Sequence, residues 1–109
     1  MTKDNLKYRA YIQILEEELV PAMGCTEPIA LAYAAAKGRE TLGAVPERIV
    51  ACCSGNMIKN VRCVQIPHSG GMQGIETAVV LGAVGGDVTA QMEVLSTATA
   101  DDIAKTKAM

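Results

Sequence analysis

The sequence predicts an α/β or α+β fold in which helices pack on a small sheet. Three observations predict it. Apolar residues recur at helical spacing near the amino terminus, two further apolar runs have helical composition, and two short runs rich in valine, isoleucine and cysteine have the length of strands. With 109 residues, the chain has the length of one domain or of a piece of one.

The first predicted helix covers about residues 5–20. Its apolar side chains lie on one face of a helix, while Arg9, Gln13, Glu16, Glu17 and Glu18 mostly face away from it. These apolar residues are Tyr8, Tyr11, Ile12, Leu15 and Leu19. Pro21 ends the helix, because proline cannot continue a helical hydrogen-bond ladder.

The second predicted helix is alanine-rich and covers residues 29–42. Thr26 is expected to cap its start, with Glu27 in the first turn and Pro28 early in the helix. Gly43 closes it. Since this helix has little polar surface, we expect it to be buried.

Two strands are predicted at residues 48–53 and 61–66, separated by one helical turn at residues 56–60. A glycine-rich connection then leads into a buried helix over residues 75–84. Residues 88–94 are ambiguous. A last helix runs to Met109 from a capped start at residues 99–102.

Charge and composition limit the partners of this chain. Ten Lys and Arg against twelve Asp and Glu give a net charge of −2 without basic runs, which argues against nucleic-acid or anionic-membrane binding. The amino terminus lacks the apolar core of a signal peptide, and no apolar run reaches the roughly 20 residues that span a bilayer, so a cytoplasmic protein is expected. The partner is therefore a small molecule or a protein.

Two further features suggest that the chain packs against something else. Phe and Trp are absent, so the core has few large side chains. The last helix has no carboxyl-terminal stop signal, and we expect a partial domain of a larger enzyme. The remaining carboxyl-terminal part of that enzyme, another subunit or a homo-oligomer would supply the packing.

The strongest candidate site lies at residues 24–28, where Cys25 stands at the start of a helix. Unpaired N–H groups and the helix dipole favour a thiolate there, so a functional thiol and an ordinary loop cysteine both remain open. Glu27 is a second candidate, or only a first-turn carboxylate that suits the dipole. Cys52, Cys53 and Cys63 form no C-x-x-C pair, and we expect them to be small apolar residues, with no metal site.

A second group of candidates follows in the middle of the chain. Asn56 and Lys59 lie three apart, so on a helical turn both would face one way and could grip a carboxylate; a surface lysine is the alternative. His68 is a proton-transfer group or an ordinary loop histidine. Backbone N–H groups around Gly71 could hold a small carboxylate.

Four blocks in order, GCTEP at 24–28, NMIKN at 56–60, GMQG at 71–74 and GAVGG at 82–86, resemble the amino-terminal part of the cysteine desulfidase family. That family is related to the alpha chain of iron–sulfur L-serine dehydratases. The similarity runs from about Tyr8 to the end of the chain, and GCTEP is its specific element. Val61 departs from the glycine that is common in the family.

The resemblance implies a lyase without pyridoxal phosphate that eliminates sulfide or water from L-cysteine or L-serine. In such enzymes a [4Fe-4S] cluster with an open iron acts as Lewis acid, a base takes the α-proton, and the product hydrolyses to pyruvate and ammonia. Cys25 would be the base or a group that exchanges onto the open iron. Asn56, Lys59 and Asn60 would hold the substrate carboxylate, and Glu27 and Gly71 complete the predicted substrate-binding set.

The family's cluster ligands lie in a later part of the sequence, so this chain alone is expected to be inactive. Two other functions remain open. One is a non-catalytic small-ligand-binding or subunit-interaction module, favoured by the few large core residues. The other is a cysteine-based redox protein that uses Cys25 as a thiolate.

Overall fold

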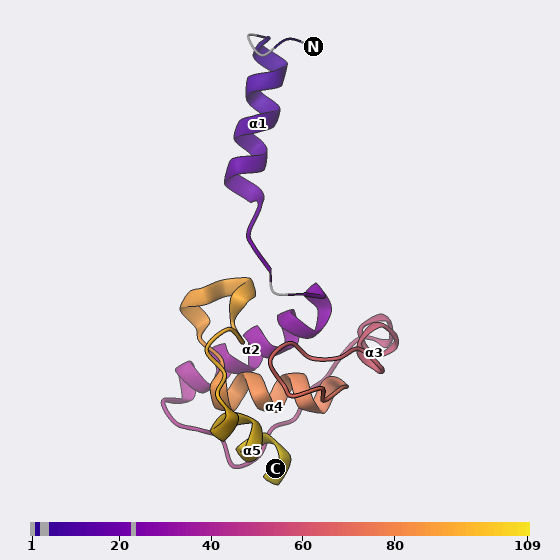
Figure 1. Ribbon diagram of the computed structural model, residues 1–109, viewed down its shortest axis with the longest axis vertical. Helices are drawn as coiled ribbons and strands as arrows, with labels where there is room; N and C mark the ends of the chain where they lie inside the picture. Colours follow the sequence, from indigo (N-terminus) through magenta and orange to yellow (C-terminus); the bar gives the residue numbers. More distant parts are fainter. Residues whose placement is uncertain (1, 3–4, 23) are drawn as a thin grey trace.

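The computed structural model describes residue 2, residues 5–22 and residues 24–109, and this part of the chain is α-rich (Figure 1). The elements in order are α1 (Leu6–Glu18), α2 (Thr26–Leu42), α3 (Gly55–Val61), α4 (Ile75–Gly85), the 3-10 helix η1 (Val88–Glu93) and α5 (Ala100–Ala108). Figure 1 shows α1 standing away from a body that the other helices form. The molecule is therefore elongated, with extents of 56 × 30 × 24 Å.

The core of the body lies where α2 packs against α4. Ile29 and Ala32 of α2 and Leu81 of α4 have no exposed surface. At Gly82 the two helices meet backbone to backbone, because a Cβ atom placed there would lie only 2.3 Å from the Ala32 carbonyl oxygen. Other buried residues complete the core: Ala36, Ile66, Ala78, Val94 and Leu95.

Arg39 fixes the end of α4 against α2. Its guanidinium donates hydrogen bonds to the carbonyl oxygens of Ala83 and Val84, both at 3.2 Å, and to that of Gly86. These carbonyls belong to the last turn of α4, where no intrahelical donor remains and where the helix dipole favours a cation. Sequence analysis did not anticipate this contact.

The predicted start of the last helix is confirmed. Thr99 caps α5 by accepting from the Asp102 N–H at 3.2 Å, while the Asp102 carboxylate accepts from the Thr99 N–H at 3.0 Å. This capping box lies against the end of α4, since a Cβ atom at Gly85 would be 2.7 Å from Asp102 Oδ2.

The predicted small sheet is wrong. Residues 48–53 have no regular secondary structure, and no backbone hydrogen bond joins them to any described residue. Residues 61–66 begin with the end of α3 and turn, and the described residues hold one isolated bridge, between Gln65 and Gln73. The chain favours extended backbone at these positions, yet a strand forms only when a neighbour pairs with it.

The predicted helices over residues 5–20, 29–42, 56–60 and 75–84 are present as α1 to α4, with small differences in their ends. The expected burial of α2 is only partly correct. Its face toward α4 is buried, but Ala34 on the outer side is exposed and Ala35 is half-buried. The ambiguous residues 88–94 fold as η1, which has Gln91 at a positive φ of 52°.

Candidate functional site

Cys25 lies at the start of α2 and is exposed. It is itself the N-cap residue, with extended backbone (φ −63°, ψ 131°), so the prediction that Thr26 caps this helix is wrong by one position. Thr26 already has helical backbone. Pro28, the third residue of α2, has no N–H to offer.

The first backbone N–H groups of α2 are available beside this thiol. Within the described part of the chain, the N–H groups of Thr26 and Glu27 have no acceptor, and the Cys25 side chain makes no capping hydrogen bond. Glu27 is half-buried in the first turn. The helix start therefore combines a thiol, a carboxylate and donors that suit a bound carboxylate group.

The three polar candidates in the middle of the chain lie on α3. Ser54 caps this helix by accepting from the Met57 N–H at 3.1 Å, which confirms the predicted helical turn. Asn56, Lys59 and Asn60 are all exposed, and Asn56 lies three residues before Lys59 and four before Asn60, so it shares a face with both. None of the three makes a side-chain hydrogen bond or an ion pair with another described residue.

The loop between α3 and α4 is held closed by Ser69, which is fully buried. Its hydroxyl lies 2.6 Å from the Ile66 carbonyl oxygen and 3.1 Å from that of Met72, and the Ile66 N–H donates to the same Met72 oxygen at 2.9 Å. Gly71 and His68 project from this loop and are exposed, both with positive φ.

These segments meet at one end of the body. A Cβ atom at Gly24 would lie 3.1 Å from Pro67 Cγ, so the loop touches the segment that precedes Cys25. Helix α3 contacts α2, and Figure 1 shows it on the side of the body where α2 begins. The fold thus brings Cys25, α3 and the loop that leads to Gly71 to one end of the body, where Cys25, Asn56, Lys59 and Gly71 are exposed.

The four cysteines are not gathered with other possible metal ligands in the described part of the chain. Among the described residues, no group of three or more His, Cys, Asp and Glu side chains is placed to hold a metal ion. All four cysteines are free thiols. Cys52 and Cys63 are exposed and Cys53 is half-buried, so these small side chains lie at or near the surface and are not among the core residues.

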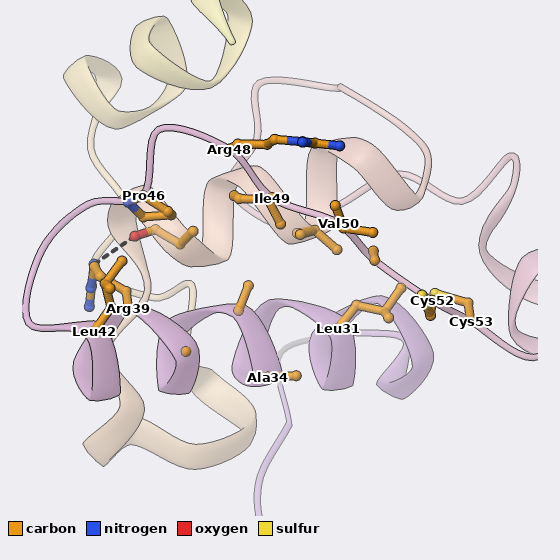
Figure 2. Close-up of a pocket in the computed structure, with 15 residues that line it drawn as sticks. Leu31, Ala34, Arg39, Leu42, Pro46, Arg48, Ile49, Val50, Cys52 and Cys53 are labelled. Carbon is orange, nitrogen blue, oxygen red and sulfur yellow. Dashed lines mark hydrogen bonds between the residues drawn. The ribbon is translucent and has the colours of Figure 1, made fainter.

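A cavity of about 420 Å³ lies elsewhere, between the outer face of α2, α4 and residues 46–53 (Figure 2). Its walls are mostly apolar, with Leu31, Ile49 and Val79 among them. In Figure 2, Cys52 and Cys53 lie at one end and Arg39 and Pro46 at the other. None of the six predicted site residues lines it.

Sequence analysis missed this cavity. The available signal was the run of small residues Ala34, Ala35 and Gly38 on the outer face of α2, which leaves space beneath the chain that crosses it.

No helix in the described part of the chain combines the length and the hydropathy that spanning a membrane requires.

The chain is similar to bacterial proteins that are each named UPF0597 protein. It is 49% identical to the protein of Lachnoclostridium phytofermentans over 100 residues, which make up 92% of this chain. It is 47% identical to the protein of Treponema denticola over 103 residues, which make up 94% of this chain. The protein of Finegoldia magna is 50% identical over 99 residues, or 91% of this chain. The chain spans 24% of the length of each relative. No protein-family model and no solved structure matches it.

Proposed function

We propose that this chain forms part of a pyridoxal-phosphate-independent, [4Fe-4S]-dependent lyase that eliminates sulfide or water from L-cysteine or L-serine. The observation that carries the proposal is that α3 lies against α2 and that the loop leading to Gly71 lies against the segment before Cys25. The segment that precedes Cys25 touches Pro67 of the loop, and α3 packs against the same helix. Residues that the resemblance assigns to one substrate are thereby held at one end of the fold.

The substrate carboxylate would bind at the open N–H groups of Thr26 and Glu27, and the exposed Lys59 ammonium group of α3 would supply the positive charge. Asn56 shares a face with Lys59 and with Asn60, and the two asparagines offer amide donors. Gly71 lies on the exposed edge of the adjoining loop, where no atom lies within 4 Å of a Cβ built at this residue. This leaves room for a small amino acid against the backbone.

Cys25 would act as the base that removes the proton from the α-carbon of the substrate. Its sulfur takes the α-proton, the electrons of the Cα–H bond form the Cα–Cβ double bond, and the Cβ–S or Cβ–O bond breaks. The leaving group takes up a proton and departs as hydrogen sulfide or water. The resulting enamine tautomerises to an imine, which water hydrolyses to pyruvate and ammonia.

The residues of this chain do not by themselves fit a [4Fe-4S] cluster. Such a cluster is held by several cysteine thiolates, and the described residues gather no set of three ligands. We therefore assign the cluster ligands to the part of the longer proteins that this chain does not include, and we expect the isolated chain to produce no pyruvate. Cys25, Glu27 and the α3 residues would then face that missing part.

The test uses the longer Lachnoclostridium phytofermentans relative, with its matched 100 residues replaced by those of this chain. Both the parent and the chimera are reconstituted anaerobically with iron and sulfide, and pyruvate formation is measured with L-cysteine and L-serine. Cys25→Ser in the chimera should lower kcat at least a hundredfold. Cys63→Ser, at an exposed thiol that follows α3, is the matched control and should leave kcat unchanged.

Absence of pyruvate from both substrates in the parent protein, with a cluster demonstrably bound, would overturn the proposal. Equal loss of activity in the two serine variants would overturn the assignment of Cys25 while leaving the lyase reaction in place.

A second candidate is a non-catalytic small-ligand-binding module, which the apolar cavity of about 420 Å³ favours. It predicts that the isolated chain binds an apolar probe such as anilinonaphthalene sulfonate. Ala35→Trp, which fills the cavity from its α2 wall, should abolish the fluorescence gain. Binding that is unchanged in this variant would contradict the use of the cavity.

A further inference from the structure

Helix α1 carries an apolar face that nothing in the described structure covers. No residue of α1 is buried. Tyr11 is 56% exposed, Leu15 49% and Leu19 70%, although the three lie on one face of the helix. Figure 1 shows the helix standing clear of the body.

A helix in this position is not expected to be stable alone. It has 13 residues, and isolated helices shorter than about 12–15 residues are marginal in water even with alanine-rich sequences. The Asn5 side chain caps it by accepting from the Lys7 N–H at 2.8 Å, and a single cap does not offset an uncovered apolar face. The helix therefore requires a surface that covers its apolar face.

The charges of α1 indicate what that surface is. Lys7 and Arg9 lie in the first part of the helix, and Glu16, Glu17 and Glu18 lie at its end. The first turn has no acidic residue and the last turn has no basic residue. This distribution is the reverse of the one that the helix dipole favours, so it weakens a solitary helix at both ends.

The charges also flank the apolar face in an ordered way. At 3.6 residues per turn, Lys7 and Glu18 border one side of this face, while Arg9 and Glu16 border the other. Glu17 lies on the opposite side of the helix, where it accepts a hydrogen bond from the Gln13 amide at 2.9 Å. Each border thus has a cation toward the amino end and a carboxylate toward the carboxyl end.

We propose that α1 is a dimerisation surface at which two copies of this chain pair with their helices antiparallel. A two-fold axis near the middle of the helix brings Lys7 opposite Glu18 of the second copy, and Arg9 opposite Glu16 of the second copy. Because the axis is two-fold, each of these ion pairs occurs twice in the dimer. The same arrangement places carboxylates beside the amino-terminal end of each helix and cations beside its carboxyl-terminal end, which suits both dipoles.

Antiparallel self-pairing also distinguishes this partner from the alternatives. A parallel pair would align like charges along both borders, which is unfavourable. A segment of the longer proteins would have to carry the complementary charge order independently, whereas a second copy of α1 carries it by symmetry. The apolar residues Tyr8, Ile12, Leu15 and Leu19 follow the alternating spacing of four and three that such helix pairs use.

The mass of the chain in solution tests the proposal directly. Sedimentation equilibrium from micromolar to millimolar concentration should give a species of twice 11.4 kDa that dissociates on dilution. Glu16→Lys should raise the dissociation constant by about tenfold or more, because two symmetric pairs change from attraction to repulsion. Glu17→Lys, which changes the same charge on the opposite side, is the matched control and should leave the constant unchanged.

Two further measurements establish the orientation. The fourfold variant with Lys7→Glu, Arg9→Glu, Glu16→Lys and Glu18→Lys reverses every border charge and should dimerise again. A carbodiimide should join Lys7 to Glu18 between chains when ¹⁴N- and ¹⁵N-labelled protein are mixed. Thermal unfolding of each variant checks that the body stays folded.

A wild-type chain that stays at 11.4 kDa throughout the concentration range would overturn the proposal. Tighter association of Glu16→Lys than of the wild type would also overturn it, since that result indicates parallel helices. Equal weakening by Glu16→Lys and Glu17→Lys would show that the border charges do not face a second copy.

Discussion

Gly82→Ala should separate the two helices that form the core. The new methyl group would lie 2.3 Å from the Ala32 carbonyl oxygen, 2.5 Å from its Cα and 2.7 Å from its carbonyl carbon. Ordinary contacts begin at 3.4 Å, so the backbone of α2 must withdraw by about 1.1 Å. A backbone cannot rotate away as a flexible side chain does, and the whole helix has to shift.

The expected loss of stability follows from two opposing terms. Overpacking a core costs about 1–3 kcal/mol, and a clash with backbone belongs at the upper end of that range. Alanine gains about 1 kcal/mol over glycine in helix propensity. We therefore expect the free energy of unfolding to fall by about 2 kcal/mol for Gly82→Ala.

Gly38→Ala provides the matched control. Gly38 also lies inside a helix, α2, but no atom lies within 4 Å of the position of its missing Cβ. Only the difference in helix propensity remains, so the free energy of unfolding of Gly38→Ala should rise by about 0.5–1 kcal/mol. Urea unfolding followed by far-ultraviolet circular dichroism measures both. A Gly82→Ala protein that is at least as stable as the wild type would refute the close approach of α2 and α4.

Three further predictions concern the polar contacts of the body, all measured by urea unfolding. Arg39→Lys should lower the free energy of unfolding by about 1–2 kcal/mol, because one ammonium group cannot donate to the three carbonyls that the guanidinium binds at the end of α4. The control is Lys37→Ala, in an exposed ion pair, which should change the free energy of unfolding by less than about 0.5 kcal/mol. Ser69→Ala should cost about 1–3 kcal/mol and speed hydrogen exchange at the Ile66 amide, since it removes the buried donor that closes the loop. Thr99→Ala should cost about 1 kcal/mol through loss of the α5 cap. An unchanged unfolding midpoint in any of the three main variants would contradict the contact concerned.

Local signals explain where prediction from the sequence succeeded. The start of α5 follows from Thr99 and Asp102 alone, because a capping box satisfies donors that lie within four residues. Residues 48–53 carry equally local β signals, but they have no regular secondary structure. The predicted sheet was wrong because strand pairing depends on a distant segment, and the described chain supplies none.

The candidate site likewise has local features that the sequence predicts and spatial features that it does not. Its residue types and the helix start at Cys25 could be read from the sequence, apart from the shift of one residue in the cap. The role of Arg39 could not, because it depends on where the last turn of α4 lies in space. The cavity beside α2 also escaped prediction, since the space depends on how residues 46–53 cross that helix.

Helix α2 links the core to the candidate site, and this link can be tested. Cys25 precedes its first turn, and Ala32, which touches Gly82, lies seven residues further along, or about 10 Å at 1.5 Å per residue. A shift of α2 at Ala32 would therefore move the helix start relative to the loop that carries Pro67 and Gly71. If the proposed lyase site is correct, Gly82→Ala in the chimera should lower kcat/KM about tenfold or more, although it touches no site residue. Gly38→Ala should leave kcat/KM unchanged, because it stabilises the same helix without moving it. Equal activity of the two variants in folded protein would mean that the position of α2 does not set the geometry of the site.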